Sequence, residues 1–249
     1  MITIKSAAEL DIMRQAGKIT ALAREEGSLL VKEGVTTKQI DKKIREVIAK
    51  HGGTPSFLGY GGFPAAACVS VNEEVIHGIP SNRVLKEGDI VKIDVGVIYK
   101  GYQGDCAATI PVGKVSPEAE KLIAVTKESF FKAIEKAVAG NRIGDIGFAV
   151  EDFVTQQGFS VVRDFVGHGI GRQMHEDPSV PNFGRPGHGV LLREGMTLAI
   201  EPMVNAGTWK VKVLSDGWTV VTIDGRLSAH YENTVAITSN GPEILTIPA

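Results

Sequence analysis

The spacing of apolar positions predicts two amphipathic helices at the start of the chain, over roughly 7–32 and 37–50. Each is preceded by a capping-box pattern, in which two side chains satisfy the free N–H groups of the first helical turn. The two caps are Ser6 with Glu9, and Thr36 with Gln39. Gly34 is expected to end the first helix, and the His-Gly-Gly sequence at 51–53 is expected to end the second.

Runs of strand-forming residues come next. They predict strands at 66–71, 89–98 and 102–112, after a loop at 55–64 that is rich in glycine and aromatic residues. The tight turn at 99–101 indicates that the last two of these strands pair as a hairpin.

The order of helices followed by strands then starts again. Ser116 with Pro117 at the first helical position predicts a helix that runs to Gly140. Asp145 is expected to begin another helix, which ends at Gly158. Further strands are expected at 159–166, 196–204, 217–224 and 227–237, with Asp224-Gly225 as a hairpin turn between the last two.

A direct sequence repeat supports a division into two halves. The segment LKEGDIVKID, at 85–94, resembles LREGMTLAIE, at 192–201, with an offset of 107 residues at both ends. We therefore expect an α+β protein with a single domain over 1–249, made of two related halves at roughly 1–113 and 114–249.

Composition is that of an ordinary globular protein and excludes several functional classes. The 249 residues are 43% hydrophobic and 22% charged, and a net charge of −2 gives no argument for a nucleic-acid or membrane partner. The N-terminal segment lacks an apolar core of signal-peptide length, and no run approaches a membrane span. Cys68 and Cys106 are the two cysteines, so a reducing, cytoplasmic location is expected and a disulfide framework is not.

The repeat gives two carboxylates equivalent positions inside apolar segments. Asp94 lies in VKIDVGVI, and Glu201 lies in LAIEPMV. A lone buried carboxylate is costly, so such groups pair with cations or change their pKa values. A second acid follows each on a later strand, Asp105 in the first half and Glu232 in the second. If the halves pack about a pseudo-twofold axis, the four carboxylates meet at the centre and favour a shared cation.

His168 adds an imidazole to this set. It stands between Gly167 and Gly169, which would let neighbouring backbone come close. Carboxylates with an imidazole suit divalent transition metals. Taken alone, a glycine-flanked histidine is more often a turn residue, and an aspartate in a strand is more often a surface residue. The glycines at 167–171 do not form a phosphate loop, and two small cysteines are more often core residues than nucleophiles.

The candidate ligands occur in an order that resembles the five-ligand dinuclear site of the pita-bread metallopeptidases. They are Asp94, Asp105, His168, Glu201 and Glu232. Five segments together resemble the type I methionine aminopeptidases over nearly the whole chain. These are NEEVIHGIP at 72–80, IDVGVIYKGYQGD at 93–105, GHGIGRQMHEDP at 167–178, IEP at 200–202 and YENTVAI at 231–237.

The resemblance implies a pita-bread fold, a curved antiparallel sheet covered by helices, with two divalent transition metal ions at its centre. Cobalt, manganese, iron and zinc all suit such ligands. Asp94 would hold one ion, and His168 with Glu201 the other. Asp105 and Glu232 would bridge the two. An activated water would attack the first peptide bond, and Glu201 is counted among the catalytic residues as well.

The resemblance also implies how substrate is bound. His175 resembles the catalytic histidine that hydrogen-bonds the scissile carbonyl and the tetrahedral intermediate, and His77 resembles the one that contacts substrate near the new amine. The pocket for the methionine side chain would be formed by Tyr60, Phe63, Cys68, Met174 and Trp218, with Phe57 as an addition.

The activity implied is N-terminal methionine excision from nascent polypeptides whose second residue is small. Association with the ribosome and a monomeric state are expected with it, and direct nucleic-acid recognition and membrane binding are not. Two alternatives stay open. One is a proline-specific aminopeptidase of the same fold, whose family normally carries a further N-terminal domain. The other is a non-catalytic binding protein of this fold, although such relatives typically lose metal ligands.

Overall fold

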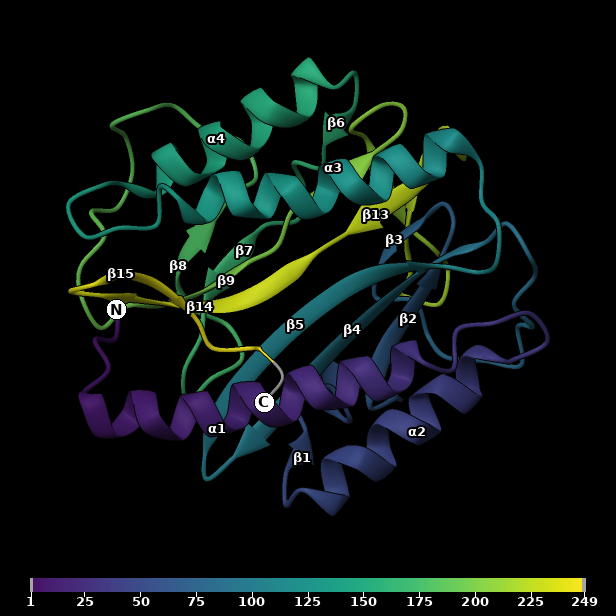
Figure 1. Ribbon diagram of the computed structural model, residues 1–249, viewed down its shortest axis with the longest axis horizontal. Helices are drawn as coiled ribbons and strands as arrows, with labels where there is room; N and C mark the ends of the chain where they lie inside the picture. Colours follow the sequence, from purple (N-terminus) through teal and green to yellow (C-terminus); the bar gives the residue numbers. More distant parts are fainter. Residues whose placement is uncertain (1, 248–249) are drawn as a thin grey trace.

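Two pairs of helices pack on the sheets of the protein. The computed structural model describes residues 2–247, and within this range the chain forms four α-helices. They are α1 (Ala7–Ser28), α2 (Thr37–Lys50), α3 (Pro117–Ile134) and α4 (Ile143–Gln156), with a 3-10 turn η1 (Tyr60–Gly62). Figure 1 shows α1 and α2 together along one half of the molecule, and α3 and α4 along the other. None of these helices is long and apolar enough to cross a membrane.

The strands form one large sheet and two small ones. Their bounds are β1 (Thr54–Pro55), β2 (Ala67–Val71), β3 (Glu74–Ile76), β4 (Ile90–Tyr99), β5 (Tyr102–Pro111), β6 (Ser160–Val161), β7 (Gly167–Gly169), β8 (Glu176–Val180), β9 (Thr197–Ile200), β10 (Met203–Asn205), β11 (Val211–Val213), β12 (Val220–Thr222), β13 (Ser228–His230), β14 (Glu232–Thr238) and β15 (Gly241–Ile244). The large sheet runs β1-β4-β5-β14-β9-β7-β8, with β2 also paired to β4 and β15 to β14.

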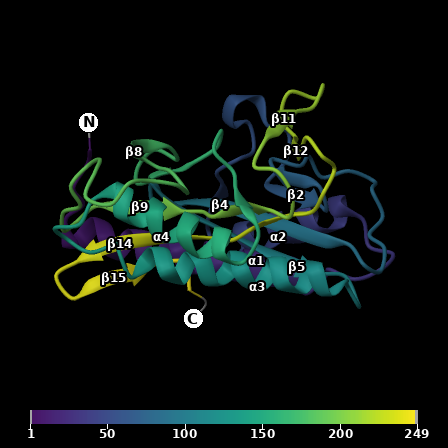
Figure 2. The same cartoon turned by 90° about the horizontal axis from the view of Figure 1, so that it is seen from above.

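The small sheets are β13-β10-β6 and β11-β12-β3. In the view of Figure 2, β11 and β12 lie on the opposite side of the molecule from α3. Strand pairing is antiparallel in the large sheet and in both small ones, as expected for an α+β protein.

Two hydrophobic cores hold the helix pairs against the large sheet. The core under α1 and α2 includes the fully buried side chains of Ile40, Ile44, Val91 and Ile93. The core under α3 and α4 includes those of Leu122, Phe130, Ile146 and Leu198. Because β5 pairs with β4 on one side and with β14 on the other, a continuous ladder joins the two cores. Side chains where β4, β5 and β14 meet are therefore fixed by the packing of both helix pairs.

The structure confirms most of the elements predicted from the sequence. Both capping boxes form, and the Ser116 hydroxyl caps α3 with Pro117 in its first turn. β4 and β5 pair over their whole length as the expected hairpin. α1 ends about one turn early, at Ser28, and α3 ends nearly two turns early, at Ile134, because turn-type hydrogen bonds take over after each helix.

The hairpin expected at Asp224-Gly225 is wrong. β12, before this turn, pairs with β11 and β3, whereas β13, after it, pairs with β10. The Asp224 carboxylate accepts hydrogen bonds from the backbone N–H groups of Thr208 and Arg226. The turn is thus built as a local sequence pattern suggests, but it connects two different sheets.

Lys92 carries a buried amino group on β4. Its side chain on β4 is 1% exposed, and Nζ donates hydrogen bonds to the carbonyl oxygens of Asn72, at 2.7 Å, and Ser228, at 3.0 Å. Burial lowers the pKa of Lys92 to about 7. Asn72 has a positive φ of 57° in the turn after β2, and Ser228 begins β13. Lys92 therefore ties this turn to β13.

Replacing Lys92 by Met should destabilise the protein by about 1–3 kcal/mol, because two buried carbonyl oxygens lose their donor. The measurement is urea unfolding of the metal-free protein. The control is Lys86→Met at an exposed position, which should stay within about 0.5 kcal/mol of the parent. Equal stability of the two variants would contradict the role given to Lys92.

Candidate metal centre and substrate pocket

Five side chains from different strands meet in one cavity of about 100 Å³. They are Asp94 on β4, Asp105 on β5, His168 on β7, Glu201 directly after β9, and Glu232 at the start of β14. All five are buried, with 2–9% of their surface exposed. The structure therefore brings together the whole set of candidate ligands that the sequence analysis named.

The strand register explains why these residues converge. Asp94 and Glu232 both lie opposite Ala107 of β5, one from each neighbouring strand. The Asp105 N–H donates to Thr234 Oγ1 at 2.9 Å, and Thr234 Oγ1 donates to the Asp105 carbonyl at 2.9 Å, which ties β5 to β14 beside the cavity. Asn182 Nδ2 donates to the carbonyl oxygen of Glu201 at 3.1 Å.

Glycines on both sides of His168 allow β7 to fit between β8 and β9. A Cβ atom on Gly167 would stand 2.3 Å from the carbonyl oxygen of Ala199, and one on Gly169 would stand 2.2 Å from that of Asp177. Both distances are shorter than any tolerated contact, so close backbone approach requires glycine here. The His168 Nδ1–H donates to the Gly169 carbonyl at 2.8 Å, which leaves Nε2 free to face the carboxylates.

Distances among the donor atoms fit a shared cation. His168 Nε2 is 3.6 Å from Glu201 Oε1 and 3.9 Å from Asp105 Oδ2. These separations are too long for hydrogen bonds, whereas two ligands that are each about 2.0–2.2 Å from one ion lie about 3–4 Å apart. Among residues 2–247, Asp94 Oδ1, Asp105 Oδ1 and Glu232 Oε1 are buried without a hydrogen-bond partner. The residues present therefore fit a divalent metal centre.

Burial also sets the charge state of the cluster. It raises the pKa of all four carboxyl groups, and repulsion by neighbouring carboxylates raises those of Asp105, Glu201 and Glu232 further. Burial, with a smaller effect of His175, lowers the pKa of His168 to about 4. His168 is thus neutral at pH 7, the form in which an imidazole can bind a metal ion.

Two more histidines stand beside the cluster. The rings of His168 and His175 have their centroids 4.3 Å apart, and Tyr60 Oη lies 2.7 Å from His175 Nδ1. His77 is half-buried with a positive φ of 59°, and its ring packs edge-on against Phe165 and Trp218 at centroid distances of 6.0 and 6.2 Å. Such a strained backbone is retained where surrounding contacts fix it, and here it directs His77 into the cavity.

An apolar wall completes the cavity. Its lining includes Phe57, Tyr60, Phe63, Cys68 and Trp218, and Phe63 stacks edge-on with Trp218 at 5.1 Å. Met174, which the sequence analysis grouped with them, does not line the cavity. It is buried in a cluster with Leu10, Met13 and Ile170, and Phe57 packs against that cluster. Phe57, which the sequence analysis named as an addition to this pocket, does line the cavity.

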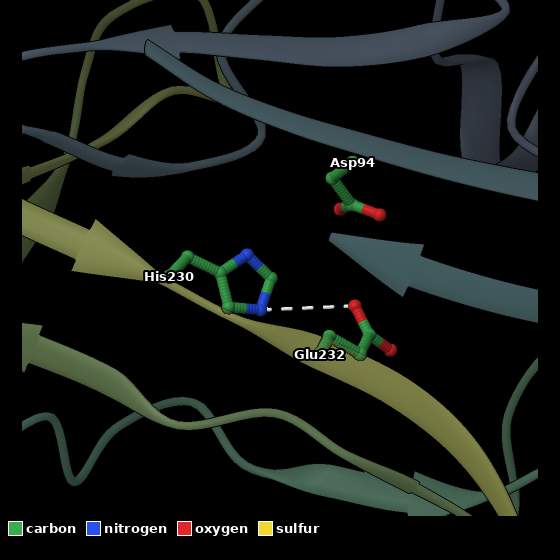
Figure 3. A group of neighbouring side chains, drawn as sticks. All are labelled: Asp94, His230 and Glu232. Atoms are coloured by element: carbon green, nitrogen blue, oxygen red, sulfur yellow. Dashed lines mark ion pairs between the residues drawn. The ribbon is translucent and has the colours of Figure 1, made fainter. Parts of the chain in front are cut away.

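The sequence analysis missed His230. This residue ends β13, is 1% exposed, and lies with Asp94 and Glu232 in a group whose possible ligand atoms are all within 4.8 Å of one another (Figure 3). Its position two residues before Glu232 was an available signal, because alternate residues of a strand share a face. A single imidazole outside the glycine-rich segment gave no other reason to select it.

Comparisons with known proteins agree with this geometry. Residues 11–239 match Metallopeptidase family M24. The methionine aminopeptidase of Clostridium perfringens (strain 13 / Type A) is 60% identical over 247 residues, 99% of each chain. The crystal structure of methionine aminopeptidase from Thermotoga maritima has a TM-score of 0.97 at 49% identity and covers 99% of both chains. The prolidase from Pyrococcus furiosus, at 24% identity and a TM-score of 0.80, shares the fold; the match covers 99% of this chain and 66% of that one.

Removal of one buried charge tests the electrostatic account of the centre. Glu232→Gln should raise the stability of the metal-free protein by about 1–2 kcal/mol, because it removes one of four buried carboxylates that repel one another. The same change should weaken binding of divalent metal at least about 100-fold. Urea unfolding and metal titration would measure these effects, with Glu33→Gln at an exposed position as control. A less stable metal-free variant with unchanged metal affinity would contradict the account.

Proposed function

The chain belongs to metallopeptidase family M24, and on this premise we propose that it is a metal-dependent aminopeptidase that removes N-terminal methionine. The observation that carries the proposal is the buried set of four carboxylates and His168, which faces an apolar wall in one cavity. Relatives named methionine aminopeptidase, matched over their full length at 60% and 49% identity, favour this activity over a proline-specific one. The convergence of all five candidate ligands disfavours a non-catalytic binding protein.

The cofactor in this proposal is a pair of divalent transition metal ions, from cobalt, manganese, iron or zinc. Asp94 would hold one ion, and His168 with Glu201 would hold the other. Asp105 and Glu232 would be shared between them. When bound in such a site, divalent ions polarise a carbonyl group and make water nucleophilic near neutral pH.

The proposed role of His175 is donation to the oxygen of the scissile carbonyl. If the Tyr60 hydroxyl donates the 2.7 Å hydrogen bond to His175 Nδ1, the ring hydrogen is on Nε2, as this role requires. Partial desolvation lowers the pKa of His175, so the ring is neutral at pH 7 and donates from one nitrogen only. Tyr60 is then a positioning residue, because it fixes the tautomer of His175. It also forms part of the pocket wall.

His77 is proposed to contact the amide nitrogen of the cleaved bond. Burial lowers the pKa of His77 to about 4, so its ring is neutral at pH 7 and can donate from one nitrogen and accept at the other. Its contacts with Phe165 and Trp218 hold it beside the apolar wall. Glu201, which reaches the cluster from the other half of the sheet, is proposed to act in catalysis as well as in binding the ion.

Substrate choice is proposed to depend on the apolar wall. Phe57, Phe63, Cys68 and Trp218 would surround an unbranched thioether, whereas a charged side chain would be buried without a partner. The physiological substrates are then nascent polypeptides with a small second residue. Association with the ribosome, a monomeric state and a cytoplasmic location belong to the same proposal. The proposal also includes a single catalytic domain over 1–249, with halves at roughly 1–113 and 114–249. The continuous large sheet supports this division into one domain with two halves.

Metal removal and a peptide series test this function together. Chelator-treated protein should cleave no peptide and should regain activity with cobalt or manganese. Burial of a methionine side chain contributes roughly 1.5–3 kcal/mol, so Met-Ala peptides should exceed Lys-Ala and Glu-Ala peptides at least about tenfold in kcat/KM. Formyl-Met-Ala and Met-Lys peptides of equal length are the controls for the free amine and the second residue. Equal cleavage of X-Pro or Lys-Ala peptides would rule out the methionine activity.

Substitutions at His175 and Tyr60 separate catalysis from metal binding. His175→Ala should lower kcat roughly 10²–10⁴-fold with metal content unchanged, because a transition-state donor is lost. Tyr60→Phe should have a smaller effect, up to about tenfold, because one hydrogen bond contributes about 0.5–1.5 kcal/mol. Tyr99→Phe, at the far end of β4, is the matched control. Normal kcat in His175→Ala, or loss of its metal, would show that His175 has another role.

A further inference from the structure

His230 is a buried imidazole that the proposed five-ligand centre does not use. Its side chain is 1% exposed, and neither Nδ1 nor Nε2 has a hydrogen-bond partner within residues 2–247. Buried polar atoms nearly always have a partner, because an unpaired one costs about 1–3 kcal/mol. The unpaired Nε2, which faces the carboxylates, therefore points to a ligand that is neither backbone nor side chain.

The ring is aimed at the carboxylates. His230 Nε2 lies 3.7 Å from Glu232 Oε2 and 3.8 Å from Glu201 Oε2. Figure 3 shows it directed into the space between Asp94 and Glu232, and the ligand atoms of these three residues lie within 4.8 Å of one another. A protonated imidazole would close on a carboxylate to hydrogen-bond distance, about 2.7–2.9 Å. The observed N–O separations are instead those expected between two ligand atoms that bind the same cation.

The distances of His230 match those of His168. His168 Nε2 lies 3.6 Å from Glu201 Oε1, and His230 Nε2 lies 3.8 Å from Oε2 of the same carboxylate. The two imidazoles thus face the two oxygens of one glutamate. His168 comes from β7 and His230 from β13, so each ring approaches the cluster from a different sheet.

Hydrogen bonds fix the backbone of His230 beside the cluster. Thr109 Oγ1 accepts a hydrogen bond from the His230 N–H at 2.9 Å and donates one to the His230 carbonyl at 2.8 Å. Two residues earlier, the Ser228 carbonyl accepts a hydrogen bond from Lys92 Nζ at 3.0 Å. Both β4 and β5 therefore hold the end of β13 against the metal centre.

We propose that His230 is a sixth ligand, and that its Nε2 binds the ion held by Asp94 and Glu232. The inference rests on the proposed dinuclear centre and deepens it. Without His230, that ion has carboxylate ligands alone among the protein groups; with it, each ion has one imidazole. Imidazole favours cobalt and zinc over manganese relative to an all-oxygen set, so His230 shifts the preference of this position toward the later transition metals.

The test compares the full-length protein with its His230→Gln and His230→Ala variants, with His188→Gln at an exposed position as the matched control. Each is made metal-free and titrated with cobalt and with manganese. The two His230 variants should bind the Asp94-side ion at least about tenfold more weakly with cobalt, and with a smaller loss for manganese. The control should keep the affinities of the parent protein.

A second measurement needs no variant. Proton NMR of the cobalt-loaded protein with ¹⁵N-labelled histidine should show two exchangeable, strongly shifted imidazole N–H signals, one each from His168 and His230. One such signal, with unchanged cobalt and manganese affinities in the variants, would overturn the sixth ligand and leave the proposed function standing. A parent protein that takes up no cobalt at the centre would overturn the proposed function as well.

Discussion

The close burial of four carboxylates at the junction of two half-structures is the constraint on which the rest of this protein depends. Each of these groups would be costly to bury alone, and together they repel one another. The fold holds them there through the β4-β5-β14 ladder and a hydrophobic core on each side. Raised pKa values and bound cations both offset this charge, so the energetic cost of burying the carboxylates and their capacity to bind metal have the same origin.

The same junction explains how the chemistry is divided among the residues. Carboxylates come from strands of both halves, while neutral imidazoles approach from the surrounding segments. His168 reaches the centre because Gly167 and Gly169 allow three strands to approach closely, and His77 reaches it through a strained backbone. His175 is held by Tyr60 on the open side of the cavity. Each imidazole is thus fixed by its neighbours, as the proposed roles in catalysis and metal binding require.

Much of this could be predicted from the sequence, because the relevant signals are local or repeated. Capping boxes, the β4-β5 hairpin and the matched positions of Asp94 and Glu201 depend on short patterns, and the structure confirms all three. The Asp224-Gly225 turn shows the limit of such patterns. Its local chemistry is that of a hairpin, but partners far along the chain pair with the strands on either side.

Two site residues show the same limit at the level of side chains. Met174 is adjacent to His175 in the sequence but packs into the core beside Phe57, since the direction of its side chain depends on long-range packing. The spacing of His230 and Glu232 indicated a shared strand face, but contacts between β13 and β5 place its ring against the cluster. Both positions are decided by contacts between distant segments of the chain.

Anomalous diffraction from crystals grown with manganese or cobalt tests the central claim most directly. The account predicts two peaks about 3.5–4 Å apart, enclosed by Asp94, Asp105, His168, Glu201 and Glu232. Protein that cleaves a Met-Ala peptide but shows no anomalous peak between these side chains would contradict it.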